Sequence, residues 1–224
     1  MADRYTPSEV LFLASNTLND IAFRSARASK TDQDSNWITI LFSAAWLEGS
    51  VNEVIYQFVE TNFGDDSERL KSVRLAARAA AIGDRFVPME RKLRVLCAAA
   101  KGVHLDENAL PWRDVLLLFR LRNWMVHLRP ERLKVRAGRD DEPSSLVSTQ
   151  VHDLVTDLLG AGAIKEIPPG HMVPVALATG LSGVGSWAYA AAFSGLQAVD
   201  SWFPEKHWQH AQPHRAPKHL DAAV

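Results

Sequence analysis

Three residues near the middle of the chain have side chains that together could bind a phosphate and move a proton. Arg122, Asn123 and His127 lie in the stretch LLFRLRNWMVHLRP, residues 117–130. An arginine guanidinium is permanently charged and a histidine imidazole titrates near neutral pH, so this combination suits phosphate binding and acid-base catalysis. The spacing alone leaves a structural alternative open, in which Arg122 pairs with an acid from another helix and His127 caps a backbone carbonyl.

The stretch that carries these residues is predicted to be a helix. It begins as a Leu-rich run of good helix formers and stops at Pro130, which cannot continue a helix. Asn123 and His127 are four residues apart and share a helix face, whereas Arg122 lies about 140° around the axis from His127. We therefore expect the Arg122 side chain either to curl toward the same groove edge or to meet the histidine of a second copy of the chain.

The hexapeptide RNWMVH resembles the signature of HEPN domains, a family of small α-helical proteins that includes many metal-independent ribonucleases. It has an arginine, a polar residue, three further residues and a histidine near the end of a Leu-rich helix, and Arg-Pro follows shortly after. Two further segments fit the pattern of this family, AAWLEGSVNEVI at residues 44–55 and WAYAAAFSGL at residues 187–196. The resemblance extends over about residues 37–203, and only the hexapeptide is diagnostic.

The resemblance implies an endoribonuclease that needs no metal or other cofactor. His127 would take the proton from an RNA 2′-hydroxyl, Arg122 would stabilise the charge that builds on the phosphate, and Asn123 would orient one of the two. Such an enzyme would be the toxin of a toxin-antitoxin pair or part of an antiviral defence system. Neighbouring arginines are predicted to contact the RNA: Arg120, Arg129 and Arg132.

The partners that this interpretation implies are RNA, a second copy of the chain and an antitoxin protein. Cleavage through a 2′-hydroxyl benefits from a base, an acid and a phosphate clamp, and two-fold pairing would set two Arg122–His127 sets across one groove. The alternative function is a non-catalytic helical module that binds a nucleotide, RNA or a protein.

Charge is distributed unevenly along the chain, although the formal net charge is only -1. Residues 69–139 contain 17 of the 25 Lys and Arg residues and 6 of the 26 Asp and Glu residues. Residues 1–66 contain 4 basic and 10 acidic residues. This segregation is typical of a surface that binds a phosphate backbone. Solvated helix faces would give the same pattern, and both interpretations remain open from the sequence.

Helical periodicity predicts an all-α fold, a single-domain bundle of five to seven helices over residues 1–203. Residues 204–224 are predicted to be a disordered tail, because they contain Pro213 and Pro217 and no apolar period. A capping box with Pro7 predicts the start of the first helix, and a polar linker over residues 29–36 is expected to follow it. Further helices are predicted at residues 37–64, 67–82, 89–100, 111–130, 146–159 and 181–203, with Gly83 and Gly102 as stops and a mobile charged loop at residues 131–145.

Glu48 interrupts the apolar stripe of the second predicted helix. A carboxylate in such a position needs a partner, and a cation from the helix of residues 117–130 is the candidate. We therefore predict that Glu48 is buried and supports the site by pairing with Arg122.

Several classes of protein are disfavoured by the composition. The single cysteine, Cys97, excludes a disulfide within one chain, and the charged N-terminus has no secretion signal, so we expect a cytoplasmic protein. Residues 167–199 lack charge, but proline and glycine interrupt them, which favours a buried or dimer-forming helix over a membrane span. Four histidines in the tail match no closed zinc pattern, and no metal site is predicted.

Overall fold

The computed structural model describes residues 7–32, 34–59, 68–83, 87–127, 134–136, 145–147, 152–165, 178–180 and 183–203. These residues form a helical bundle with one short two-stranded hairpin, which confirms the all-α prediction in its main feature. The helices are α1 (Pro7–Ala28), α2 (Asp34–Val59), α3 (Glu68–Ala79), α4 (Met89–Lys101), α5 (Trp112–His127), α6 (His152–Gly160) and α8 (Val184–Trp202). The strands are β1 (Lys134–Arg136) and β2 (Ser145–Val147).

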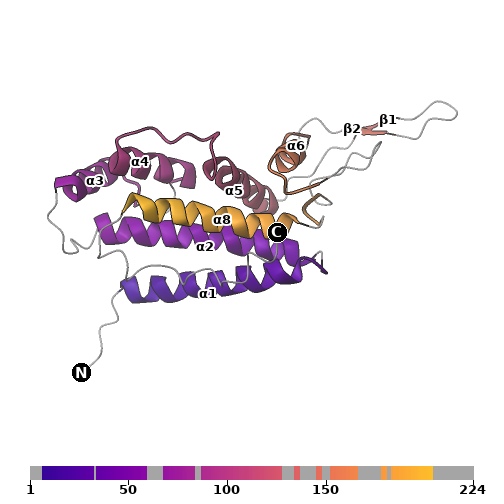
Figure 1. Ribbon diagram of the computed structural model, residues 1–224, viewed down its shortest axis with the longest axis horizontal. Helices are drawn as coiled ribbons and strands as arrows, with labels where there is room; N and C mark the ends of the chain where they lie inside the picture. Colours follow the sequence, from indigo (N-terminus) through magenta and orange to yellow (C-terminus); the bar gives the residue numbers. More distant parts are fainter. Residues whose placement is uncertain are drawn as a thin grey trace, which may run out of the picture.

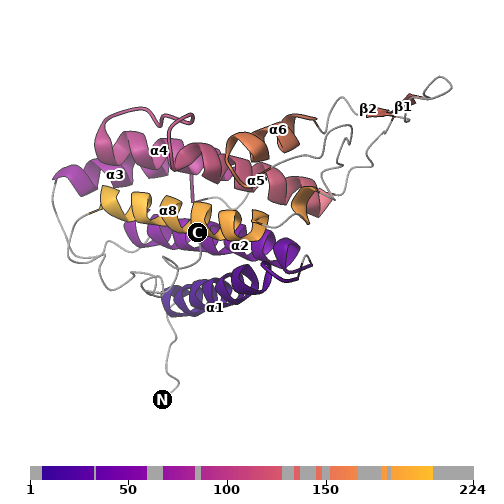
Figure 2. The ribbon, with the colours of Figure 1, turned by 45° about the vertical axis from the view of Figure 1, so that its right-hand side comes forward.

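Helix α2 is the centre of the bundle. It packs most extensively against α1 on one side and α8 on the other, and the three helices run side by side (Figures 1 and 2). Helices α4 and α5 contact α8, and α5 also contacts α2 and α6. Helix α8 therefore lies between the pair α1 and α2 and the helix α5, which carries the predicted site.

Two glycines allow α8 to approach its neighbours closely. A Cβ atom added at Gly195 would lie 2.6 Å from the Cγ2 of Val115 on α5, and one added at Gly185 would lie 2.6 Å from the Oδ1 of Asn36 on α2. In the structure that Asn36 oxygen instead accepts a hydrogen bond from the Gly185 backbone N–H at 2.7 Å. Asn36 thus caps the first turn of α8 from another helix, where Gly183 offers no side chain to do so.

An aromatic cluster fills the region between α1, α2 and α8. Tyr189 stacks on Trp46 with ring centroids 5.6 Å apart, and it also contacts Phe23 and Phe193. Its hydroxyl donates a hydrogen bond to the Oδ1 of Asn19 at 3.0 Å. Burial, with a smaller contribution from the charge of Asp20, raises the pKa of Tyr189 to about 12.

Helix α2 is the one helix among the described residues that is long and apolar enough, over Asp34–Tyr56, to cross a membrane. Of the window that meets this criterion, 61% is buried inside the bundle. A helix that is apolar around most of its circumference is also what the centre of a bundle requires. The composition of α2 is accounted for by its packing between α1 and α8.

The hairpin corrects the prediction for residues 131–159. Part of the predicted loop and the start of the predicted helix are strands: Val135 pairs with Leu146 in antiparallel register, and α6 begins only at His152. Strands of three residues are too short to establish a period of two, and the apolar residues after Pro143 also fit the period of the following helix. The β-branched Val135 and Val147 are the local signal that favours strands.

Two helix boundaries also differ from the predictions. Helix α2 begins at Asp34, inside the predicted linker, because the Asp32 carboxylate accepts hydrogen bonds from the Asp34 N–H and the Ser35 hydroxyl and so fixes the first turn. Helix α3 ends before Ala81, which has φ 51°, and not at Gly83. The Ile82 N–H reaches back to the Ala77 carbonyl at 3.2 Å, which completes the turn without glycine. Gly102 closes α4 in the left-handed conformation as predicted.

Candidate functional site

The buried face of α5 determines which of its side chains reach solvent. Val115, Leu118, Leu121 and Met125 recur every three or four residues and are at most 5% exposed. Because this face packs toward α2 and α8, the polar residues of α5 are turned outward. Trp112 and Phe119 are buried as well, so these aromatic residues of the helix belong to the core.

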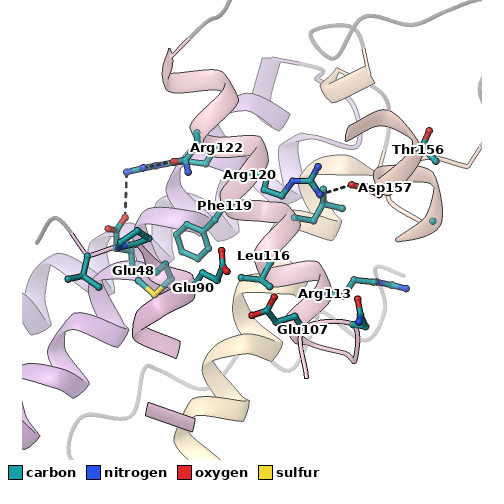
Figure 3. Close-up of a pocket in the computed structure, with 17 residues that line it drawn as sticks. Glu48, Glu90, Glu107, Arg113, Leu116, Phe119, Arg120, Arg122, Thr156 and Asp157 are labelled. Atoms are coloured by element: carbon teal, nitrogen blue, oxygen red, sulfur yellow. Dashed lines mark hydrogen bonds and ion pairs between the residues drawn. The ribbon is translucent and has the colours of Figure 1, made fainter. Parts of the chain in front are cut away.

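A cleft of about 880 Å³ lies along the outward side of α5. Residues from α2, α4, α5, α6 and the connection between α4 and α5 line it, and several of them are charged (Figure 3). The positive side chains are Arg113, Arg120 and Arg122, and the negative ones are Glu48, Glu90, Glu107 and Asp157.

Arg122 stands at one end of this cleft between two partners. Its Nη1 donates to the Oδ1 of Asn123 at 2.9 Å, and its Nη2 lies 3.5 Å from the Oε2 of Glu48. The contact with Glu48 is the one predicted from the sequence, but the predicted burial is wrong. The side chains of Arg122 and Glu48 are 34% and 31% exposed, because α2 turns this edge of its apolar stripe toward the cleft.

His127 lies apart from this group. It is the last residue of α5, its side chain is exposed, and it does not line the cleft. Figure 3 shows Arg122 directed toward Glu48 on one side of α5 and Arg120 directed toward Asp157 on the other. One chain therefore brings Arg122, Asn123 and Glu48 together and leaves His127 outside the group, as the angular separation on the helix indicated.

Arg120 pairs with an acid that sequence reasoning missed. Its Nη1 lies 2.6 Å from the Oδ2 of Asp157 on α6, and the two side chains are 54% and 43% exposed. No local pattern connects residues so far apart along the chain, so the pair could not be predicted. Arg129 and Arg132, the other predicted RNA contacts, lie outside the described residues, as does the His-containing tail of residues 204–224.

The cleft is not a uniformly positive groove. Arg94 reaches Glu90, with Nη2 2.5 Å from Oε1, and also bonds Glu107 in the connection after α4. The hydrogen bond from Arg94 lowers the pKa of Glu107, and the same bond raises the pKa of Arg94. Glu107 is therefore ionised at neutral pH. Among the basic residues of 69–139 whose side chains the structure describes, Arg113, Arg120 and Arg122 line the cleft and the others lie elsewhere on the helices.

Metal-binding side chains do not gather in the described ranges: no group of three or more His, Cys, Asp and Glu residues there is placed to hold an ion. Comparison with models of protein families, with curated proteins and with solved structures found no match to this chain.

Proposed function

We propose that this chain is a metal-independent endoribonuclease of the HEPN type that cleaves RNA by attack of a 2′-hydroxyl. The observation that supports the proposal most directly is the position of Arg122. Glu48 and Asn123 hold its guanidinium at the rim of an open cleft, where it is one-third exposed. These two contacts occupy two of its five N–H donors, so further donors can meet a phosphate oxygen.

The reaction requires a base beside that phosphate. A neutral His127 imidazole would accept the proton of the 2′-hydroxyl, whose oxygen then attacks the adjacent phosphorus. The bond from phosphorus to the 5′-oxygen breaks, and an acid returns a proton to that oxygen. The products are a 2′,3′-cyclic phosphate and a 5′-hydroxyl. Arg122 would stabilise the negative charge on the phosphate oxygens in the transition state.

A homodimer would complete the site. Arg122 and His127 lie about 140° apart around the axis of α5, and the Arg122 guanidinium contacts Glu48, so a single chain would not direct both side chains at one phosphate. Two-fold pairing of the exposed ends of α5 would combine the Arg122 of one copy with the His127 of the other, and would supply one histidine as base and one as acid. An antitoxin partner and a role as a toxin or as part of an antiviral defence system belong to the same proposal.

The test is incubation of purified protein with single-stranded RNA in excess chelator. We expect cyclic-phosphate ends, and we expect His127→Ala and Arg122→Ala each to reduce the rate by at least about 100-fold without lowering the melting temperature. Arg24→Ala on α1, which removes an arginine whose side chain is 81% exposed, is the matched control and should cleave normally. Loss of cleavage in chelator, or full activity of His127→Ala, would contradict the proposal.

Subunit mixing tests the composite site. An excess of His127→Ala chains should suppress the activity of unmodified chains below simple dilution, because mixed dimers lack one histidine. A protein that cleaves RNA as a monomer at micromolar concentration would exclude the dimer.

The charge of the cleft favours a second candidate, a non-catalytic binding module. Four acidic side chains face three arginines there, and such a balance suits a ligand with charges of both signs better than a polyanion. RNA that stays intact at high protein concentration would support this candidate.

A further inference from the structure

A row of side chains along the outward face of α5 is separate from the Arg122 group. Arg113, Arg120 and His127 follow one another at intervals of seven residues. Seven residues complete almost two turns, so each side chain lies within about 20° of the previous one and about 10 Å further along the helix. Both arginines line the cleft, with side chains 45% and 54% exposed, and His127 is exposed at the end of the row.

The two arginines of the row have different acidic partners. Arg113 Nε lies 3.0 Å from Oδ1 of its neighbour Asp114, which also accepts a hydrogen bond from Trp187 Nε1 at 3.3 Å and is only 16% exposed. Arg120 pairs with Asp157, which belongs to another helix and is 43% exposed. An exposed pair of this kind is weak, so an incoming phosphate can take the place of the Asp157 carboxylate.

Carboxylates from outside α5 restrict where a phosphate backbone can lie in the cleft. Glu90 on α4 and Glu107 in the connection after it line the cleft, and Arg94 contacts both of them. Carboxylates repel a phosphate backbone, so an RNA strand in the cleft would keep its phosphates on the α5 side.

We propose that Arg113 and Arg120 bind the phosphate backbone of a single-stranded RNA segment that leads to His127, and that Asp157 competes with the RNA for Arg120. The proposal rests on the proposed function for the identity of the ligand. It assigns to Asp157 a role that opposes binding: the carboxylate occupies Arg120 when RNA is absent and lowers the affinity of the row for RNA.

Binding is measured on His127→Ala protein, so that cleavage does not interfere, with a short fluorescent single-stranded RNA over about 50 to 200 mM salt. Arg120→Gln should weaken binding severalfold and reduce the slope of log affinity against log salt by about 0.7, the value for one phosphate contact on a single strand. Arg113→Gln should act in the same direction. Asp157→Asn should tighten binding, and it should have no effect when Arg120 is already glutamine.

Arg24 and Asp20 on α1 provide the matched control, because they form another exposed ion pair, with 3.7 Å between Nη2 and Oδ2. Arg24→Gln and Asp20→Asn should leave both affinity and salt slope unchanged. Equal effects of Arg24→Gln and Arg120→Gln would overturn the row, as would an Asp157→Asn variant that binds no more tightly.

The outcomes separate this proposal from the proposed function. If Arg120→Gln and Arg113→Gln leave cleavage unaffected, RNA binding by the row is wrong and the proposed ribonuclease activity stands. If RNA binds through Arg120 but stays intact with unmodified protein, the ribonuclease activity is wrong and RNA binding by the row stands. Absence of RNA binding at low salt would contradict both proposals.

Discussion

Polar contacts at the interface of α2 and α8 differ from those in the α5 cleft in their access to water. Asn36 is fully buried and bonds both the Gly185 N–H and the Gly180 carbonyl. The Arg122–Glu48 pair is about one-third exposed. A buried group that loses its partner costs about 1 to 3 kcal/mol, whereas an exposed ion pair contributes about 0 to 1 kcal/mol. Stability therefore depends on the interface, and the cleft can exchange its contacts for those of a ligand.

High pH should weaken the interface most. The pKa of Tyr189 is about 12 in the folded protein, above the ordinary value of 10.0, so the folded state retains its proton when the unfolded chain has lost it. The stabilisation is complete below pH 10 and is lost as the pH rises toward 12, by about 1.4 kcal/mol per pH unit and about 2 to 3 kcal/mol in total. Chemical denaturation as a function of pH measures this loss. A Tyr189→Phe variant with the same pH dependence would show that other groups cause it.

Close packing of α8 should be the next most sensitive feature. Gly195→Ala would place a Cβ 2.6 Å from Val115 Cγ2, and the overpacking should reduce the free energy of unfolding by about 1 to 3 kcal/mol despite the better helix propensity of alanine. Gly160→Ala on α6 is the control, since nothing lies within 4 Å of its added Cβ, and it should be neutral or slightly stabilising. Equal melting temperatures for the two variants would disprove the close approach.

Removing the Asn36 amide should cost about 1 to 2 kcal/mol. Asn36→Ala leaves the Gly185 N–H without its acceptor and removes the cap of α8. Asn123→Ala in the cleft removes an exposed amide that bonds Arg122, and it should change stability by less than about 0.5 kcal/mol. Denaturant titration of both variants compares the regions directly. A larger loss for Asn123→Ala would reverse the comparison.

The smallest effect is expected at Glu48. Glu48→Gln removes a carboxylate that is about one-third exposed, so we expect a loss below about 1 kcal/mol and a smaller one at high salt. Thermal melts at low and high salt provide the measurement. A loss of several kcal/mol would mean that the pair behaves as a buried one, as the sequence had suggested.

The sequence predicted what local periodicity determines. The spacing of the apolar residues and Pro111 predicted the α5 helix, and Gly102 predicted the end of α4. The sequence-based prediction failed where the structure depends on segments of only a few residues or on contacts between residues far apart along the chain. Ala81 has a left-handed backbone conformation in a turn that backbone hydrogen bonds complete. The residue type at this position does not predict that conformation.

The candidate site was predictable only in part. Glu48 was recognised because a charge interrupted an apolar stripe, and its contact with a cation of α5 followed from that. The exposure of Glu48 depends on how α2 is rotated about its own axis in the bundle. The spacing of the apolar residues does not determine that rotation accurately enough to place a single side chain inside or outside the core. Asp157 and Glu107 carry no such signal, because each is an ordinary polar residue of its own segment and meets its arginine only after the helices pack.

The position of α8 beside α2 has a consequence for synthesis of the chain. The ribosome completes α2 well over a hundred residues before it completes α8, which at ~5–20 residues per second is a delay of roughly 7 to 30 seconds. During that time α1, α3 and α5 can contact α2, while the surface of α2 that packs on Tyr189 and Gly195 lacks the helix that covers it in the folded protein. An apolar helix exposed for that long is a natural substrate for a chaperone, so the yield of folded protein in cells should depend on chaperone capacity more than its final stability suggests.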